Sequence, residues 1–187
     1  MVKVIGICGK KGSGKSTLAE FLCNEMGYKQ VSFASKLKDI VSILFGWDRN
    51  MLEGTTEESR AEREKVDERW SSKLGRTVTP RNVLQDIGCM FRNEYHPEFW
   101  IKIADMQGAA AVVISDVRFL NEAAMIRDIG GVIIHVKRDS NGVDDHASEM
   151  EMERIKPDFI IENNGTREDM FDHLVCIVSG NCREISK

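Results

Sequence analysis

Short apolar runs alternate with amphipathic stretches along most of the chain. The runs fall at residues 2–8, 30–34, 109–115, 132–136 and 159–162, and each has the length of one strand. Between them, apolar residues recur at helical spacing, as at Leu18, Leu22 and Met26. The third and fourth runs are apolar almost throughout, which is typical of parallel strands covered on both faces. The pattern predicts an α/β fold in three layers, with a five-stranded parallel sheet between helices.

A helical region is expected between about residues 35 and 105. Within it, Thr79 followed by Pro80 has the form of a helix N-cap with proline in the first turn. In that helix Arg81, Gln85 and Arg92 follow one another at spacings of four and seven residues, so they lie on the same side. The sequence thus predicts a helix with one polar, cationic stripe.

The segment 55–69 is crowded with charged residues and has almost no apolar stripe. This composition is typical of a solvated helix or a mobile excursion. The alternative is that Arg60 or Arg63 reaches a substrate, and the sequence does not choose between the two arginines.

A glycine-rich motif follows the first predicted strand. Positions 9–17 have the sequence G-K-K-G-S-G-K-S-T, which fits the P-loop spacing G-x-x-x-x-G-K-[ST]. Glycines let backbone N–H groups turn inward around a phosphate chain, and the next helix adds the positive end of its dipole. Lys15 is then placed to reach the β- and γ-phosphates, and the Ser16 hydroxyl to bind Mg²⁺. The motif predicts a site for nucleotide phosphates.

The overall composition narrows the range of partners. With 187 residues, 30% of them charged, and a net charge of -4, we expect one soluble domain without a broad nucleic-acid surface. The N-terminal apolar run is only one strand long, which predicts neither a signal peptide nor a membrane span, and hence a cytoplasmic protein. Five cysteines without a C-x-x-C pair predict free thiols rather than a zinc site or a disulfide.

Charged and amide side chains follow several of the predicted strands. Because the carboxyl ends of parallel strands share one edge, Asp116, Arg118, Arg138 and Asn163 are expected to gather beside the P-loop. Phosphoryl transfer needs such a set, since its catalysis comes from alignment and charge neutralisation. Asp116 would hold a magnesium-bound water or a substrate hydroxyl, unless it only stabilises a helix N-terminus. Both arginines would face phosphate groups.

A polar, turn-rich loop follows the fourth predicted strand. It suits a lid, over about residues 139–155, that closes to exclude water from a transferable phosphate. Within it, His146 and Glu149 would either close over the nucleotide or lie in a solvated loop.

Two classes of P-loop protein fit these residues, a small-molecule kinase and a nucleotide-dependent switch or ATPase. A GTPase is disfavoured, because the D-x-x-G match at 128–131 ends a helix and no N-K-x-D motif is present. The cationic side chains exceed what one triphosphate needs. Together with the lid-like loop, this excess favours a kinase.

Seven parts of the chain together resemble a known family. They are residues 9–17, Phe33-Ala34 with Leu37-Lys38, residues 81–88 with Trp100, Asp116 with Arg118, residues 131–138, His146 with Glu149, and residues 163–165. The chain resembles the deoxynucleoside monophosphate kinases of bacteriophages and large DNA viruses, a branch of the P-loop nucleoside monophosphate kinases. The resemblance implies Mg²⁺-dependent transfer of the ATP γ-phosphate to a deoxynucleoside 5′-monophosphate, for DNA synthesis in a host cytoplasm.

The resemblance also implies roles for individual residues. The ATP site would comprise Lys11, Gly12, Ser13, Gly14, Lys15, Ser16 and Thr17, with Asn163, Asn164 and Gly165 against the adenine. The acceptor site would comprise Lys10, Ala34, Lys38, Arg81, Gln85, Trp100 and Asp116. Catalysis would use Lys10, Lys15, Arg118 and Arg138, and the metal would be held by Ser16 and Asp116. Trp100 is at least as typical of a hydrophobic core as of a pocket wall.

Departures from the family leave the acceptor open. The family pattern often has threonine where this chain has Cys89, next to the expected acceptor residues. The acceptor would be dTMP, dGMP, or a 5-hydroxymethylated dCMP or dUMP. A P-loop kinase of a non-nucleotide acceptor, such as dephospho-coenzyme A, is the alternative enzyme. A homodimer is a common outcome, but no apolar stripe marks its interface.

Overall fold

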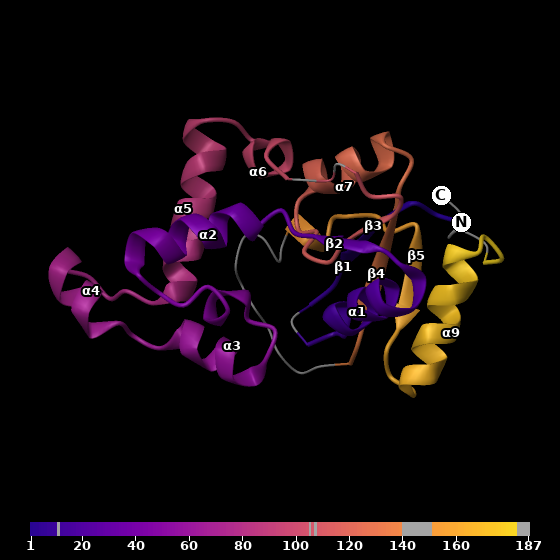
Figure 1. Ribbon diagram of the computed structural model, residues 1–187, viewed down its shortest axis with the longest axis horizontal. Coiled ribbons are helices and arrows are strands. Elements are labelled where there is room, and N and C mark those ends of the chain that lie inside the picture. The colour runs from indigo at the N-terminus through magenta and orange to yellow at the C-terminus, as the bar shows by residue number, and fades with distance from the viewer. Residues whose placement is uncertain (11, 105, 107, 140–150, 183–187) are drawn as a thin grey trace. The chain divides into compact units, whose positions relative to one another are not determined.

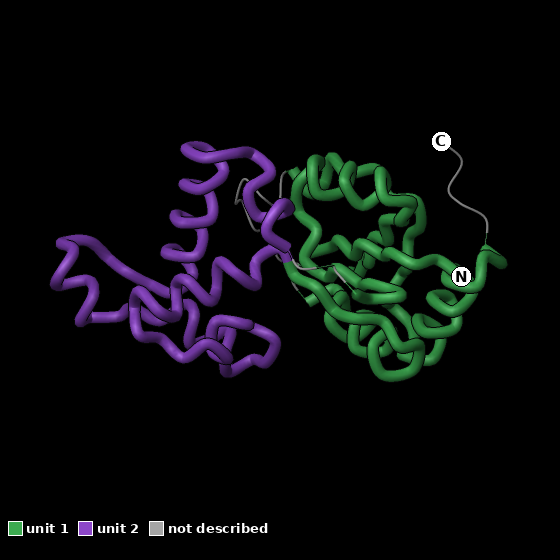
Figure 2. The backbone as a smooth tube through the Cα atoms, turned by 45° about the horizontal axis from the view of Figure 1, so that its top comes forward, with its two compact units in different colours: residues 1–32, 105–187 green, residues 33–104 purple. Residues whose placement is uncertain are grey.

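A computed structural model describes residues 1–10, 12–104, 106, 108–139 and 151–182 (Figure 1). The chain divides into two compact units (Figure 2). Unit 1 consists of residues 1–32 and 105–187, and unit 2 of residues 33–104. Unit 2 covers nearly the same residues as the helical region expected from the sequence. Most of the predicted lid, including His146 and Glu149, lies outside the described residues.

Unit 1 is built on a five-stranded parallel sheet. Its strands are β1 (Val4–Cys8), β2 (Lys29–Val31), β3 (Val112–Ile114), β4 (Val132–Lys137) and β5 (Phe159–Glu162), in the order β2-β3-β1-β4-β5. The predicted α/β class and strand number are therefore confirmed. Strands β2 and β3 are shorter than the apolar runs that predict them. Strand β2 ends early because residues 32–34 lead into the helix α2 (Ser35–Phe45).

Helices cover both faces of this sheet, which makes the three layers. On one face, α1 (Lys15–Met26) and α9 (Arg167–Val178) pack against buried side chains such as Ile7, Ile134 and Ile161. The other face carries α7 (Leu120–Asp128) (Figure 1). Gly6 allows α7 to approach closely, since a Cβ atom there would lie 2.7 Å from the side chains of Ile126 and Ile133.

Unit 2 contains only helical elements. They are α2 (Ser35–Phe45), the short 3₁₀ helix η1 (Met51–Glu53), α3 (Glu57–Glu64), α4 (Glu68–Leu74), α5 (Pro80–Glu94) and α6 (Phe99–Lys102). Helix α5 begins as predicted, because the Thr79 hydroxyl accepts the N–H of Asn82, whose side chain accepts the Thr79 N–H. Leu37 of α2 and Leu84 of α5 are both buried in its core. In the described ranges, no helix combines the length and apolar character needed to cross a membrane.

The charged segment 55–69 forms α3 and the start of α4. Neither helix has a buried residue, as expected for a solvated helix. Arg60 donates to the carbonyl oxygens of Gly54 and Thr55, at 3.2 and 2.8 Å. Arg63 donates to the carbonyl oxygen of Glu53 at 3.5 Å. Both arginines thus hold the turn that precedes their own helix.

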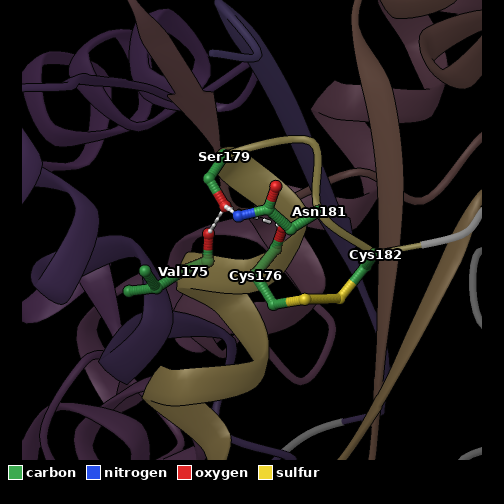
Figure 3. Close-up of a disulfide and its surroundings, with 5 residues drawn as sticks. All are labelled: Val175, Cys176, Ser179, Asn181 and Cys182. Carbon is green, nitrogen blue, oxygen red and sulfur yellow. Dashed lines mark hydrogen bonds between the residues drawn. A yellow bond between two sulfur atoms is a disulfide. The ribbon is translucent and has the colours of Figure 1, made fainter.

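The cysteines correct one prediction from the sequence. Cys8, Cys23 and Cys89 carry free thiols as expected, but Cys176 and Cys182 form a disulfide at the end of α9 (Figure 3). The chain turns back here, and the N–H groups of Asn181 and Cys182 both donate to the carbonyl oxygen of Cys176. This turn brings the two Cα atoms to 5.4 Å, within the usual range for a disulfide. A spacing of six residues gives no sequence signal for it.

Candidate active site

The P-loop connects the end of β1 to the start of α1. Gly9, Gly12 and Gly14 have φ values of 143°, 79° and 106°, a region that side chains rarely allow. Space is limiting at two of them as well. A Cβ atom at Gly9 would lie 2.4 Å from the carbonyl oxygen of Val136, and one at Gly14 would lie 2.5 Å from Nδ2 of Asn163. Glycine is therefore required by both backbone conformation and close packing.

Polar groups of the P-loop face one another around this turn. Lys15 Nζ donates to the carbonyl oxygens of Gly9 and Lys10, at 2.5 and 2.7 Å. The Ser13 side chain is buried, and its Oγ has no hydrogen-bond partner among the described residues. Ser16 and Thr17 follow in the first turn of α1. A buried hydroxyl, a lysine and a helix N-terminus form a set that can hold phosphate oxygens.

Two residues in the described part of the predicted lid, Met152 and Glu153, contact the P-loop. The Gly9 N–H donates to Sδ of Met152 at 3.3 Å, and Met152 is buried. Lys10 Nζ lies 3.1 Å from a carboxylate oxygen of Glu153, and both side chains are about half exposed. Sequence reasoning missed both residues, because no motif marks them. Lys11, the remaining lysine predicted for the ATP site, lies outside the described residues.

Asp116 lies at the carboxyl end of β3, as its strand predicts. Its Oδ2 accepts a hydrogen bond from the Ser32 hydroxyl at 2.6 Å, and Ser32 follows the neighbouring strand β2. This contact fixes the carboxylate at the strand edge, and nothing in the sequence pattern singles out Ser32. The Ser16 hydroxyl and the Asp116 carboxylate are oxygen donors of the kind that Mg²⁺ prefers. Among the described residues, no group of three or more His, Cys, Asp or Glu side chains could hold a metal ion.

The two predicted catalytic arginines follow β3 and β4, and both side chains are exposed. Arg118 is anchored through its backbone, because its N–H donates to Oε2 of Glu122 at 2.8 Å. The same oxygen accepts the Phe119 N–H at 3.1 Å, and Glu122 is only 2% exposed. A buried carboxylate thus caps α7 and holds the backbone of Arg118. Arg138 lies one residue beyond β4.

The paired asparagines after β5 point to different partners. Nδ2 of Asn163 donates to the carbonyl oxygen of Ser13 in the P-loop at 2.7 Å. Asn164 instead accepts the Asp139 N–H at 3.0 Å and donates to its carboxylate at 3.1 Å. Gly165 then leads into the N-cap of α9. The loop after β5 is therefore tied both to the P-loop and to the end of β4.

Two titratable groups lie side by side near this edge, Cys8 on β1 and His135 on β4. Burial raises the pKa of the Cys8 thiol to about 12. Burial, together with the charges of Lys137 and Lys15, lowers the pKa of His135. Neither group is charged at neutral pH, so the positive charge at this edge comes from lysines and arginines.

Two of the predicted acceptor residues of unit 2, Lys38 and Arg81, are held in separate groups of ion pairs. In the first, Lys38 Nζ lies 2.6 Å from Glu53 Oε2. Arg49 pairs with Glu53 as well, and with Asp39 at 2.7 Å. Burial alone would raise the pKa of Glu53, but hydrogen bonds and charges from Lys38 and Arg49 outweigh it and lower that pKa. Ala34, the N-cap residue of α2, precedes this group in the chain.

The second group lies on α5. Arg81 pairs with Glu64 of α3 at 2.9 Å, and about a quarter of the Arg81 side chain is exposed. Gln85 lies one turn further along α5 and is half-buried. The structure thus places the predicted cationic stripe against the charged segment 55–69. Sequence reasoning identified Arg81 but not Glu64.

Trp100 lies in the hydrophobic core, which is one of the two roles that its sequence position allowed. It is 2% exposed, and its Nε1 donates to the carbonyl oxygen of Gly88 at 3.0 Å. Its ring packs edge-on against Phe91 and Phe99. Trp100 is therefore a core residue of unit 2, and its contact with an acceptor stays a prediction.

The P-loop after the first strand of a parallel sheet, with cations at neighbouring strand ends, is an arrangement typical of P-loop phosphotransferases. The sequence profile for deoxynucleotide monophosphate kinase matches residues 53–174. A protein of Acanthamoeba polyphaga mimivirus, named as a candidate deoxynucleotide monophosphate kinase, is 35% identical in an alignment of 193 positions that covers 94% of this chain and 95% of that one. The chain therefore belongs to the deoxynucleotide monophosphate kinase family, and the resemblance drawn from its sequence is confirmed.

Two solved structures that match most of this chain are named as kinases. The shikimate kinase of Aquifex aeolicus matches over 95% of this chain and 97% of its own, with 16% identity and a TM-score of 0.44. The dephospho-CoA kinase of Campylobacter jejuni matches over 97% of this chain and 100% of its own, with 16% identity and a TM-score of 0.44.

Proposed function

We propose that this kinase transfers the γ-phosphate of ATP to a deoxynucleoside 5′-monophosphate and releases ADP and the diphosphate. The proposal is carried by the P-loop, whose left-handed glycines, buried Ser13 hydroxyl and Lys15 form a cradle for a phosphate chain. Family membership supports the acceptor class. Supply of precursors for viral DNA synthesis is the role that the mimivirus relative suggests.

The residues divide the work between the two substrates. The P-loop of unit 1 would hold the ATP phosphates, with Lys15 against the β- and γ-phosphates. Arg118 and Arg138 would neutralise charge on the migrating phosphoryl group, which is the main requirement of this reaction. Lys10 would stay close to that group. Asp116 would accept a hydrogen bond from the acceptor or hold a metal-bound water.

Mg²⁺ fits the oxygen donors present. The residues that would hold it are Ser16 and Asp116, together with the substrate phosphates, because Mg²⁺ usually takes only one or two protein carboxylates. The ion would supply charge neutralisation between the β- and γ-phosphates. Asp116 is already oriented by the Ser32 hydroxyl.

The acceptor would be bound by unit 2. Lys38 and Arg81 are each paired with a carboxylate, Glu53 and Glu64 respectively. A bound 5′-phosphate would compete with these carboxylates or share the cations with them, which favours a dianionic acceptor over a neutral one. Gln85 would add a neutral amide for the base.

The test is ADP release from ATP and Mg²⁺ with each acceptor supplied singly. The acceptors are the four common deoxynucleoside monophosphates, their ribose counterparts, and 5-hydroxymethylated dCMP and dUMP. Stimulation by one or a few deoxynucleotides is the expected result. Hydrolysis at one rate, whatever the acceptor, would contradict the proposal and favour a nucleotide-dependent switch. No turnover with any nucleotide would point to a non-nucleotide acceptor.

A further inference from the structure

Asn163 joins two parts of the site that are 150 residues apart in the sequence. Its backbone is fixed first, because its N–H donates to the carbonyl oxygen of Lys137 at the end of β4, at 2.7 Å. The side chain then crosses to the P-loop, where Nδ2 donates to the carbonyl oxygen of Ser13 at 2.7 Å. The amide donor is therefore used by the protein itself, on the loop that holds phosphate.

This contact constrains one peptide group of the P-loop. In a planar trans peptide the C=O and the following N–H point in opposite directions. Holding the Ser13 oxygen toward β5 therefore turns the Gly14 N–H away from Asn163. Gly14 immediately precedes α1, and N–H groups at this position are the donors that bind anions at a helix N-terminus.

The glycine at position 14 also leaves room for the Asn163 side chain. Gly14 has a φ of 106°, and a Cβ atom there would lie only 2.5 Å from Nδ2 of Asn163. The glycine thus leaves room for the amide as well as adopting the left-handed conformation. The neighbouring Asn164 makes no such contact, because its amide bonds Asp139.

We propose that Asn163 is a positioning residue that acts on the nucleotide phosphates through the Ser13–Gly14 peptide, rather than a residue that reads the adenine base. The inference rests on the proposed function, since it takes the P-loop ligand to be a nucleoside triphosphate. It changes the role that family resemblance assigns to Asn163. Substitution of Asn163 should weaken phosphate binding whether or not a base is attached.

The experiment compares ATP with inorganic tripolyphosphate, which has the phosphate chain but no base. Isothermal titration calorimetry with Mg²⁺ measures both Kd values for the wild type and for Asn163→Asp and Asn163→Ala. Aspartate replaces the donor by an acceptor facing the Ser13 oxygen, whereas alanine only removes the donor. Both variants should weaken ATP and tripolyphosphate by the same factor, about tenfold or more for aspartate.

A matched control is Asn24→Asp, the same charge change at an exposed position of α1. It should leave both Kd values unchanged. The equality of the two losses is the readout that a general loss of structure would not produce, provided that the Tm of the alanine variant stays near that of the wild type. The KM for the acceptor should also be unaffected in both Asn163 variants.

Two results would overturn the inference. If ATP binds more weakly but tripolyphosphate does not, Asn163 contacts the base or ribose. If neither affinity changes, the contact with Ser13 has no role in binding. Failure of the proposed function looks different, because it appears in the acceptor assay with the wild type as ADP release that no deoxynucleotide stimulates, whereas the inference about Asn163 is decided by the two affinities alone.

Discussion

The two units of this kinase build their candidate sites from different materials. In unit 1 the site is mostly backbone, with left-handed glycines, strand ends and a helix N-terminus held by Asn163 and Met152. In unit 2 it is mostly side chain, with Lys38 and Arg81 each paired to a carboxylate. A backbone site has one geometry and suits an invariant ligand such as a triphosphate. A network of ion pairs can be altered residue by residue, which suits an acceptor that differs between enzymes.

The largest effect is expected when the charge of Lys15 is removed from the P-loop of unit 1. Lys15→Ala should lower kcat by about 10²–10³-fold, because the transition state loses one of the cations that would neutralise its charge. The acceptor KM should change little. Steady-state kinetics with both substrates varied would measure this, with Lys3→Ala on the exposed start of unit 1 as a control. Near-normal turnover would remove Lys15 from the mechanism.

A second substitution tests whether the P-loop backbone of unit 1 leaves room for a side chain at Gly9. Gly9→Ala should lower the free energy of unfolding by about 2–3 kcal/mol, because the new Cβ would collide with the Val136 carbonyl. Gly27→Ala is the matched control. Gly27 also has a positive φ, but nothing lies within 4 Å of a Cβ there, so only about 1 kcal/mol should be lost. Chemical denaturation measures both, and equal losses would show that strain alone matters.

A substitution in the candidate site of unit 2 should change the KM for the acceptor but not the KM for ATP. Arg81→Ala should raise the acceptor KM by about ten- to a hundredfold, the usual value of a charge-assisted hydrogen bond, with the ATP KM nearly unchanged. Arg76→Ala serves as the control, because Arg76 pairs with Asp86 in the same unit at an exposed position. An equal rise in both KM values would take Arg81 out of the acceptor site and erase the contrast between the units.

The smallest effect concerns the acid stability of the Lys38–Glu53–Arg49 group. Because the pKa of Glu53 is lowered from its ordinary value of 4.5, the folded state binds a proton there less readily than the unfolded chain. Its contribution to stability is therefore complete above that pH and is lost as the pH falls below it. Thermal unfolding between pH 6 and pH 3 should show a shallower fall in Tm for Glu53→Gln than for the wild type.

Glu25→Gln, on the exposed part of α1, removes the same charge without these partners. It should leave the pH dependence of Tm as it is in the wild type. If Glu53→Gln behaves like this control, the ion pairs around Glu53 do not stabilise unit 2.

The sequence predicts the candidate site of unit 1 better than that of unit 2, because the site of unit 1 is made from local features of the chain. The P-loop spacing and the end of each apolar strand are local properties, and a parallel sheet brings the strand ends to one edge. Asp116, Arg118 and Arg138 could therefore be assigned to that edge in advance. Ser32 could not, because its role depends on which strand lies beside β3.

The carboxylate partners were harder still to predict. Glu53 and Glu64 are two among many acidic residues of the region, and only the packing of η1 and α3 selects them. Glu122 is a partial exception, because a glutamate at the third position of a helix is typical of a capping box. The residue three positions before it is Phe119 rather than serine or threonine, so the usual signal was incomplete. The disulfide between Cys176 and Cys182 depends on the turn after α9 in the same way.

Unit 2 enters the chain in one piece, between strands β2 and β3, which are neighbours in the sheet. Unit 1 is thus interrupted once, and its P-loop, its two predicted catalytic arginines and its asparagine loop all lie outside the interruption. A gene could exchange residues 33–104 for the corresponding segment of a relative with only two junctions, one after β2 and one before β3. If unit 2 binds the acceptor as proposed, such modular exchange would offer a route by which acceptor choice diversifies while the P-loop unit is inherited unchanged.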